Sequence, residues 1–243
     1  ILNYIKETAD ENNIKKNIRY NTKIISSNWD SSANLWTLTC TDNTTGKEIQ
    51  FQAKYIISCM GYYNYDKAYK AKFEGEKDFK GPIIHPQFWP EDLDYSDKNV
   101  VIIGSGATAI TLVPAMADKA KHVTMLQRSP TYIASMPNKS LVPNFATKNL
   151  PVKIQYDLNR ATHIGFSVFQ YNLCKSQPEL MKAYFKNEAR KNLPKGYDID
   201  KHFTPKYNPW DERVCAVPDG DLFDVLSNGK ASIITDHIEK FTE

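Results

Sequence analysis

The chain has 243 residues, and its 31 lysines and arginines against 28 aspartates and glutamates leave a net charge of +3. Such a small excess of positive charge does not point to nucleic acid or to an anionic membrane as a partner. No apolar run approaches the roughly 18 residues that a membrane span needs, and the first residues lack the layout of a signal peptide. We therefore expect a cytoplasmic protein with one large or two modest domains.

The first part of the chain predicts a short helix followed by an antiparallel sheet. The apolar residues Ile1, Leu2, Ile5 and Ala9 fall on one helical face. Three extended segments separated by polar turns come next, at residues 18–26, 35–40 and 49–60. The glycine and tyrosine stretch 61–65 then suits a linker between domains.

A Rossmann-type βαβ unit is predicted from the apolar run 100–103, which is followed by a glycine turn and then by an apolar helix. The strand is apolar enough to be buried on both faces of a parallel sheet. In the turn, Gly104 permits the tight bend, Gly106 lets a pyrophosphate approach the backbone, and Ala109 permits close packing. The candidate cofactor-binding residues of the turn are Gly104, Ser105, Gly106, Ala107, Thr108 and Ala109.

The second strand of this unit, residues 122–129, ends in Gln127, Arg128 and Ser129, about 20 residues beyond the glycines. An acid at this place binds the ribose hydroxyl of NAD, whereas an arginine accommodates the 2′-phosphate of NADP. A guanidinium binds a phosphate through two hydrogen bonds, and a carboxylate repels it. These three residues therefore predict a cofactor site that prefers NADP(H).

The remainder of the chain predicts helices and a return to α/β order. Pro130, Pro137 and Pro143 indicate that the chain leaves the sheet. Residues 151–193 have helical spacing, and residues 221–227 and 231–234 predict a short helix and a strand. The aromatic residues of this part are expected to form core rather than to line a pocket; they are Phe166, Phe169, Tyr171, Tyr184, Phe185, Phe203, Tyr207 and Trp210.

Two groups of possible metal ligands are predicted to have other roles. The acidic cluster lacks the alternate spacing and the glycine of a calcium loop, so we interpret it as a solvated loop; it consists of Glu91, Asp92, Asp94 and Asp97. The cysteines form no C-x-x-C pair and are expected to be buried free thiols; they are Cys40, Cys59, Cys174 and Cys215. No metal site is predicted.

The most specific pattern of the chain is Phe79-x-Gly81-x-x-x-His85-x-x-x-Trp89-Pro90, which stands directly before the glycine turn. This segment resembles the fingerprint of the Baeyer-Villiger monooxygenases, a group of the flavin-containing (class B flavoprotein) monooxygenase family. The resemblance extends over nearly the whole chain, through residues 61–66, 85–95, 104–114 and 122–133.

The resemblance implies an oxidoreductase in which NADPH reduces FAD and O2 then oxygenates a small apolar ketone or a sulfur or thioamide compound. It implies that Arg128 binds the phosphate of NADPH. It also implies that Arg213 is a catalytic arginine, which stabilises the negatively charged oxygenated flavin and meets the nicotinamide, with His85 as a second catalytic residue. An ion pair of Arg213 with Asp211 or Asp219 is the alternative role.

Two features depart from the family pattern. Glu212 stands where many relatives have a lysine that helps to hold the 2′-phosphate, so the preference for NADPH over NADH is expected to be weaker. The family's other glycine turn, which binds FAD, has no counterpart among the glycines of this chain. We therefore expect the middle part of a longer enzyme, inactive without the missing FAD-binding parts.

The predicted fold is α/β, with a Rossmann-type dinucleotide-binding domain in residues 69–136 and 211–243 and a helical insertion in residues 137–210. Residues 1–68 are predicted to be an antiparallel β segment from a partial flavin domain. Two other functions stay open: a non-catalytic NADP(H)-binding module, which has no need of His85 or Arg213, and the NADPH domain of a flavin disulfide reductase. The absence of a redox cysteine pair disfavours the reductase.

Overall fold

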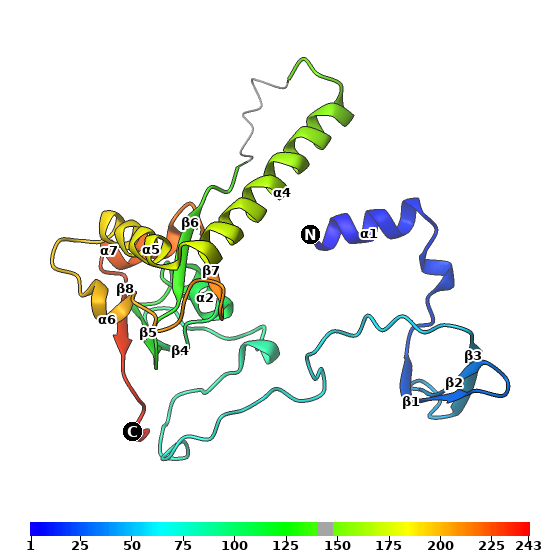
Figure 1. The fold of residues 1–243 in the computed structure, drawn as a ribbon. Coiled ribbons are helices and arrows are strands. Elements are labelled where there is room, and N and C mark those ends of the chain that lie inside the picture. Colours follow the sequence, from blue (N-terminus) through cyan, green and yellow to red (C-terminus); the bar gives the residue numbers. More distant parts are fainter. Residues whose placement is uncertain (140–147) are drawn as a thin grey trace. The chain divides into compact units, whose positions relative to one another are not determined.

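The computed structural model describes residues 1–139 and 148–243, so Pro143 and the adjoining part of the predicted insertion lie outside the described residues. The chain divides into two compact units, Ile1–Lys67 and Ala68–Glu243 (Figure 1). The predicted boundary between residues 68 and 69 lies one position from this division. None of the helices in the two described ranges combines the length and the apolarity that crossing a membrane requires.

The first unit contains a helix and an antiparallel sheet. These elements are α1 (Leu2–Glu11), the short 3-10 helix η1 (Lys15–Asn17), β1 (Thr22–Asp30), β2 (Leu35–Asp42) and β3 (Glu48–Ala53). The strands pair antiparallel in the order β1-β2-β3, as predicted. Asp30 and Asp42 end the first two strands, and each carboxylate accepts hydrogen bonds from backbone N–H groups two and three residues further on, which closes the turn.

The first unit has almost no core. Cys40 in β2 is its one buried hydrophobic residue among those described, and no residue of α1 is buried. The predicted third strand is too long, because β3 ends at Ala53 and residues 54–60 are irregular. Ala53 pairs with Trp36, the second residue of β2, so β2 offers almost nothing for a longer β3 to pair with.

The second unit contains the predicted βαβ unit. Strands β4 (Asn99–Ile103), β5 (His122–Gln127) and β8 (Ala231–Thr235) are parallel, in the order β4-β5-β8, and α2 (Ala107–Met116) connects the first two. Ile102, Met125 and Ile233 lie side by side in register and are buried with residues of α2 and of α7 (Asp221–Ser227). The predicted α/β class is confirmed.

The opposite face of the same sheet is exposed. Val101 is 58% exposed, Ile103 46% and Ile234 48%. The prediction that the strand at residues 100–103 is buried on both faces is therefore wrong for this chain. Helix α2 packs against β4, and its buried residues share the core with Ile102, on the other side of the strand.

A second, two-stranded parallel sheet is formed by β6 (Tyr132–Met136) and β7 (Val214–Pro218). It was not predicted, because the prolines after Ser129 were interpreted as a departure from sheet structure. In sequence, α4 (Val152–Ser176), α5 (Pro178–Asn192) and α6 (Ile199–His202) lie between these strands. The helical spacing predicted at residues 151–193 thus corresponds to two helices, α4 and α5. They meet at Gln177, where Pro178, which lacks an N–H, occupies the first position of α5.

Helix α4 extends away from the sheets of its unit (Figure 1), and Cys174 is its one buried residue. The prediction that the aromatic residues form core is confirmed for Phe185 and Phe203. It is wrong for Phe166, Phe169, Tyr171, Tyr184 and Trp210, which are exposed. Similarly, Cys40, Cys174 and Cys215 are buried free thiols, whereas Cys59 is exposed in the irregular segment after β3.

Candidate functional site

The glycine turn joins the carboxyl end of β4 to the N-terminus of α2. Gly104 has a φ of +127°, which side chains other than glycine rarely adopt, and its N–H donates to Leu126 O at 2.8 Å. Gly106 is the N-cap of α2 and has no side chain with which to cap it. A Cβ at either glycine would meet no heavy atom within 4 Å. An anion can therefore approach the first amides of the helix.

The next residues of the turn and helix differ in exposure. Ala107 and Thr108 are exposed at the start of α2, whereas Ala109 is buried in the core of the unit. The burial of Ala109 agrees with the close packing expected of a small residue at that place.

Arg128 and Ser129 follow β5 at the same edge of the sheet as the glycine turn, because the carboxyl ends of parallel strands lie together. Both residues are exposed. Within residues 1–139 and 148–243, no hydrogen bond or ion pair involves the guanidinium of Arg128. Its charge is available to an anionic ligand.

Gln127, the third predicted cofactor residue at this strand end, has its side chain in the interior. Its Nε2 donates to His202 O and to Thr235 Oγ1, both at 2.9 Å. These bonds connect β5 to α6 and to the end of β8. The side-chain amide is thus used within the fold.

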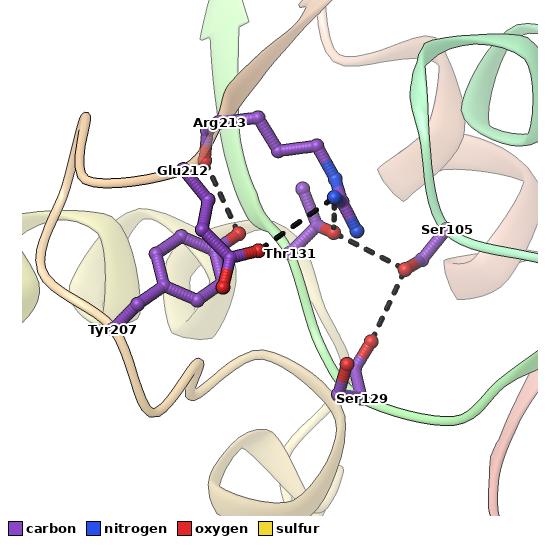
Figure 2. Close-up of polar contacts among 6 residues, drawn as sticks. All are labelled: Ser105, Ser129, Thr131, Tyr207, Glu212 and Arg213. Atoms are coloured by element: carbon purple, nitrogen blue, oxygen red, sulfur yellow. Dashed lines mark hydrogen bonds and ion pairs between the residues drawn. The ribbon is translucent and has the colours of Figure 1, made fainter.

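Arg213 lies directly before β7, and its side chain reaches the glycine turn through Thr131 (Figure 2). Arg213 Nε donates to Thr131 Oγ1 at 3.2 Å, and this oxygen lies 3.1 Å from Ser105 Oγ. Ser105 Oγ in turn donates to Ser129 O at 3.1 Å. The structure therefore brings together the turn, the residues after β5 and the residue before β7.

The carboxylates nearest to Arg213 in sequence do not neutralise it. Arg213 Nη1 lies 3.8 Å from Glu212 Oε2, a weak ion pair between exposed groups. Asp211 pairs instead with Lys175 at 2.6 Å, and Asp219 accepts from the Asn138 N–H. In the described part of the chain, neither forms the ion pair with Arg213 that the sequence left as an alternative.

Two tyrosines hold the main chain beside Arg213. Tyr207 OH donates to Arg213 O at 3.2 Å, and Tyr132 OH donates to Tyr207 O at 2.7 Å. Their rings meet edge to face, with centroids 5.3 Å apart. Burial raises the pKa of Tyr132 to about 12 and also raises the pKa of Tyr207, so both hydroxyls are protonated donors at neutral pH.

In the family motif, Phe79 and Gly81 form a local contact. The ring of Phe79 lies over Gly81, where an added Cβ would be 2.7 Å from two ring carbons, so any larger residue at 81 displaces the ring. Phe79 also meets the ring of Phe241 edge-on, with centroids 6.1 Å apart. These residues connect the motif to the segment that follows β8.

The second half of the motif forms a short turn. His85 Nδ1 accepts from the Gln87 N–H at 3.2 Å and caps the 3-10 helix η2 (Pro86–Phe88). Trp89 meets Tyr95 edge-on at 6.4 Å, and Pro90 O accepts from the Leu93 N–H. No hydrogen bond, ion pair or ring contact between described residues connects the motif to Arg213 or to the glycine turn.

Thr131 is the residue of this site that the sequence did not predict. It is a hydroxyl residue directly before the apolar residues 132–134, and that placement was the signal available in the sequence. Ser129 was predicted for its hydroxyl, whereas the structure uses its carbonyl oxygen. Two guanidiniums and the amides of α2 make this sheet edge suited to a phosphorylated ligand. Among the described residues, no three His, Cys, Asp or Glu side chains gather as metal ligands.

The parallel strands, the glycine turn and the arginine after β5 together define a Rossmann-type α/β domain. The chain belongs to the FMO-like family of flavin-binding monooxygenase-like proteins, whose family model matches residues 1–149. The family expected from the sequence is confirmed.

Relatives match the chain over its whole length. The FAD-containing monooxygenase EthA of Mycolicibacterium smegmatis is 49% identical over 244 residues, which cover 100% of this chain and 49% of that protein. The probable FAD-binding monooxygenase AlmA of Acinetobacter baylyi is 48% identical, with the same coverage. The chain thus spans about half the length of the relatives that it matches.

Solved structures share the fold. Cyclohexanone monooxygenase from Rhodococcus sp. Phi1 bound to NADP+ aligns with 97% of this chain and 49% of its own, with a TM-score of 0.70 and 17% identity. A steroid monooxygenase bound to NADP aligns with 96% of this chain and 49% of its own, with a TM-score of 0.72 and 19% identity. At these identities the comparison establishes the fold alone.

Proposed function

We propose that this chain is the NADPH-binding part of an FAD-dependent Baeyer-Villiger-type monooxygenase, which uses O2 to oxygenate a small apolar ketone or a sulfur or thioamide compound. Family membership and the names of the relatives support the reaction class. The two similar structures are monooxygenases bound to NADP or NADP+, which supports the cofactor. The substrate class follows from the resemblance of the motif at residues 79–90.

The observation that carries the proposal is the guanidinium of Arg128, which has no partner among the described residues and lies at the sheet edge that also holds the glycine turn. NADPH has a 2′-phosphate that NADH lacks, and a guanidinium binds a phosphate through two charge-assisted hydrogen bonds. The Ser129 hydroxyl is exposed beside it and adds a donor. Gln127 stands where an NAD-binding site carries an acid, and its neutral side chain is turned into the core.

The glycine turn fits the pyrophosphate of the same cofactor. The space outside Gly104 and Gly106 is open, and the N-terminal end of α2 begins there. Backbone amides and the helix dipole favour a negative group at this place. Among the described residues, Gly104 and Gly106 form the one G-x-G turn between a parallel strand and a helix, so the turn suits the pyrophosphate of NADPH and no second turn of this kind is left for FAD.

When bound, FAD supplies the redox chemistry, because it is reduced by NADPH and then activates O2. Arg213 contributes a permanent positive charge, with its Nε held by Thr131 and its side chain 46% exposed. We assign it to stabilising the negative charge that develops beside it and to holding the nicotinamide. The nearby carboxylate of Glu212 offsets part of this charge. Because Glu212 also stands where a lysine would help to hold the 2′-phosphate, the preference for NADPH over NADH is expected to be weaker.

His85 is the second proposed catalytic residue. Its Nδ1 accepts a hydrogen bond from the Gln87 N–H, so the neutral ring carries its proton on Nε2. The imidazole is exposed. His85 can therefore donate a hydrogen bond from Nε2 to a ligand.

The proposed domains follow the same division of roles. Residues 69–136 and 211–243 form the cofactor-binding domain, and they contain β4, β5 and β8. We assign residues 137–210, of which 137–139 and 148–210 are described, to a helical insertion with α4, α5 and α6, and residues 1–68 to a flavin-domain segment.

The test measures dinucleotide binding by the purified chain with fluorescence or calorimetric titration. Arg128→Ala is expected to weaken NADPH binding roughly 10- to 100-fold and to leave NADH binding unchanged within about twofold, because only NADPH presents the phosphate. Arg160→Ala, at an exposed arginine of α4, removes the same charge away from the site and serves as the control.

Equal losses for NADPH and NADH would reject the role of Arg128. A similar loss in the Arg160→Ala variant would show that the titration reports net charge rather than a site. Tight, stoichiometric retention of FAD by the chain alone would contradict its assignment to the NADPH-binding part.

A further inference from the structure

We propose that Thr131 is a positioning residue that couples the glycine turn to Arg213. The inference rests on the proposed function, in which the turn binds the pyrophosphate of the dinucleotide and Arg213 meets its nicotinamide. Thr131 holds the turn through Ser105 and the guanidinium through Nε, as drawn in Figure 2.

The strand pairing explains why Thr131 and Arg213 are neighbours. β6 and β7 are parallel, and Tyr132 at the start of β6 pairs with Val214 at the start of β7. Thr131 and Arg213 each stand one residue earlier, so the register of this small sheet sets one beside the other. The two residues are 82 positions apart in sequence.

The other bonds of Thr131 and Ser105 determine which of the two hydroxyls donates to the other. Arg213 Nε is a donor, so Thr131 Oγ1 accepts from it. Ser105 uses its single hydroxyl hydrogen to donate to Ser129 O. The hydrogen between the two hydroxyls therefore belongs to Thr131, which donates to Ser105 Oγ across 3.1 Å. The resulting series of hydrogen bonds runs from the Arg213 guanidinium to the Ser129 carbonyl, and its bonds polarise one another.

Burial makes these bonds difficult to replace with water. Thr131 is 1% exposed and Ser105 is 6% exposed. Arg213 uses only Nε in this chain of bonds, so the outer nitrogens of its guanidinium remain free of the two hydroxyls. Thr131 therefore orients the guanidinium without occupying the donors that a ligand would use.

Removing the Thr131 hydroxyl breaks this series of hydrogen bonds on both sides, at Arg213 and at Ser105. In Thr131→Val, which preserves the shape of the side chain, Arg213 Nε loses its acceptor and Ser105 Oγ loses a donor. Arg128 is outside these hydrogen bonds, and the substitution keeps the bond from Ser105 Oγ to Ser129 O, so recognition of the 2′-phosphate by Arg128 and Ser129 is expected to be retained. The affinities for NADPH and NADH should decrease together.

The experiment compares Thr131→Val, Thr131→Ser and Thr162→Val in the purified chain, by titration with NADPH and with NADH and by thermal melting. Thr131→Val is expected to weaken both dinucleotides about fivefold to tenfold. Thr131→Ser keeps the hydroxyl and should restore both affinities to within about twofold. Thr162→Val removes a hydroxyl on α4 that, within the described residues, bonds to Leu158 O, and it should leave both affinities unchanged.

Ser105→Ala interrupts the same series of hydrogen bonds at its glycine-turn end. It serves as an independent variant if Thr131→Val does not fold. It should weaken both dinucleotides, and the double variant should lose less than the sum of the two single losses. Additive losses would overturn the coupling.

Unchanged affinity in Thr131→Val would also overturn the proposal, as would a lowered melting temperature without rescue of binding by Thr131→Ser. If Arg128→Ala separates NADPH from NADH while Thr131→Val changes neither, the coupling fails and the proposed function stands. If Thr131→Val weakens both and Arg128→Ala does not separate them, the NADPH assignment fails and the coupling stands.

Discussion

The two units of the chain have regular strands in common and differ in what the strands bury. In Ile1–Lys67, three antiparallel strands enclose one buried hydrophobic residue, Cys40. In Ala68–Glu243, the parallel sheet and its helices bury a contiguous cluster. Turns and alternating side chains are thus sufficient to pair strands, whereas a core requires a second layer against the sheet.

The largest expected difference between the units is the loss in free energy of unfolding when an aromatic side chain is truncated to alanine. Phe223 is 1% exposed and lies in the cluster, so Phe223→Ala should lower the free energy of unfolding of the second unit by about 3–5 kcal/mol. Trp29 in β1 is 45% exposed, so Trp29→Ala should cost the first unit less than about 1 kcal/mol.

Hydrogen-exchange mass spectrometry measures these effects separately, because peptides from β5 and from β2 report on different units. Equal loss of protection in the two variants would contradict the contrast between a unit with a core and a unit without one.

A second test makes the same substitution at one glycine in each unit. Gly75 and Gly46 have φ of +75° and +72°, so alanine is strained at both, by about 1–2 kcal/mol. At Gly46 the new Cβ meets nothing, whereas at Gly75 it would clash with the backbone oxygen of Phe241. Gly75→Ala should therefore cost more, about 2–3 kcal/mol, as measured by urea unfolding. Equal midpoint shifts would show that the segment at Phe241 yields freely.

The smallest effects concern pH, and they have opposite directions in the two units. Hydrogen bonds lower the pKa of Asp30, chiefly from the Ser32 side chain, and of Asp42, chiefly from the Thr44 N–H. The stability that they contribute is present above 3.8, the ordinary pKa of aspartate, and is lost as pH falls through the lower folded values.

In the second unit, burial raises the pKa of Tyr132 from 10.0 to about 12. Its contribution is complete below pH 10 and is lost as pH rises towards 12. Hydrogen exchange across the pH range should therefore show acid weakening the turns of the first unit and alkali weakening the core beside β6. Tyr132→Phe should reduce the alkaline effect and leave the part that comes from Tyr207, whose pKa burial also raises. An unchanged alkaline loss in that variant would assign the effect to another group.

The parts of the fold that depend on neighbours in sequence were predictable. The strand, turn and helix around Gly104 follow from local pattern, and so does the position of Arg128 after the next strand. The pairing of β6 with β7 was not predictable, because it joins segments whose leading residues, Thr131 and Arg213, are 82 positions apart. The exposure of Val101 was missed because an apolar strand does not indicate whether a second layer covers it.

In the candidate site, too, the features set by local sequence were predictable and those set by tertiary contacts were not. Residue type and spacing identified the turn and both arginines, whereas the inward direction of Gln127 and the role of Thr131 depend on tertiary hydrogen bonds. A hydroxyl residue beside a strand end has many possible partners, and its sequence position does not select among them.

The contact between Phe79 and Gly81 limits how the motif can evolve. A side chain at position 81 displaces the ring at 79, and that ring also provides the edge-on contact with Phe241. A change at 79 or 81 therefore loses the same packing, so the second change adds little further harm. In an alignment of descendants, positions 79, 81 and 241 should vary together, and lineages that retain the phenylalanine at 79 should also retain the glycine at 81.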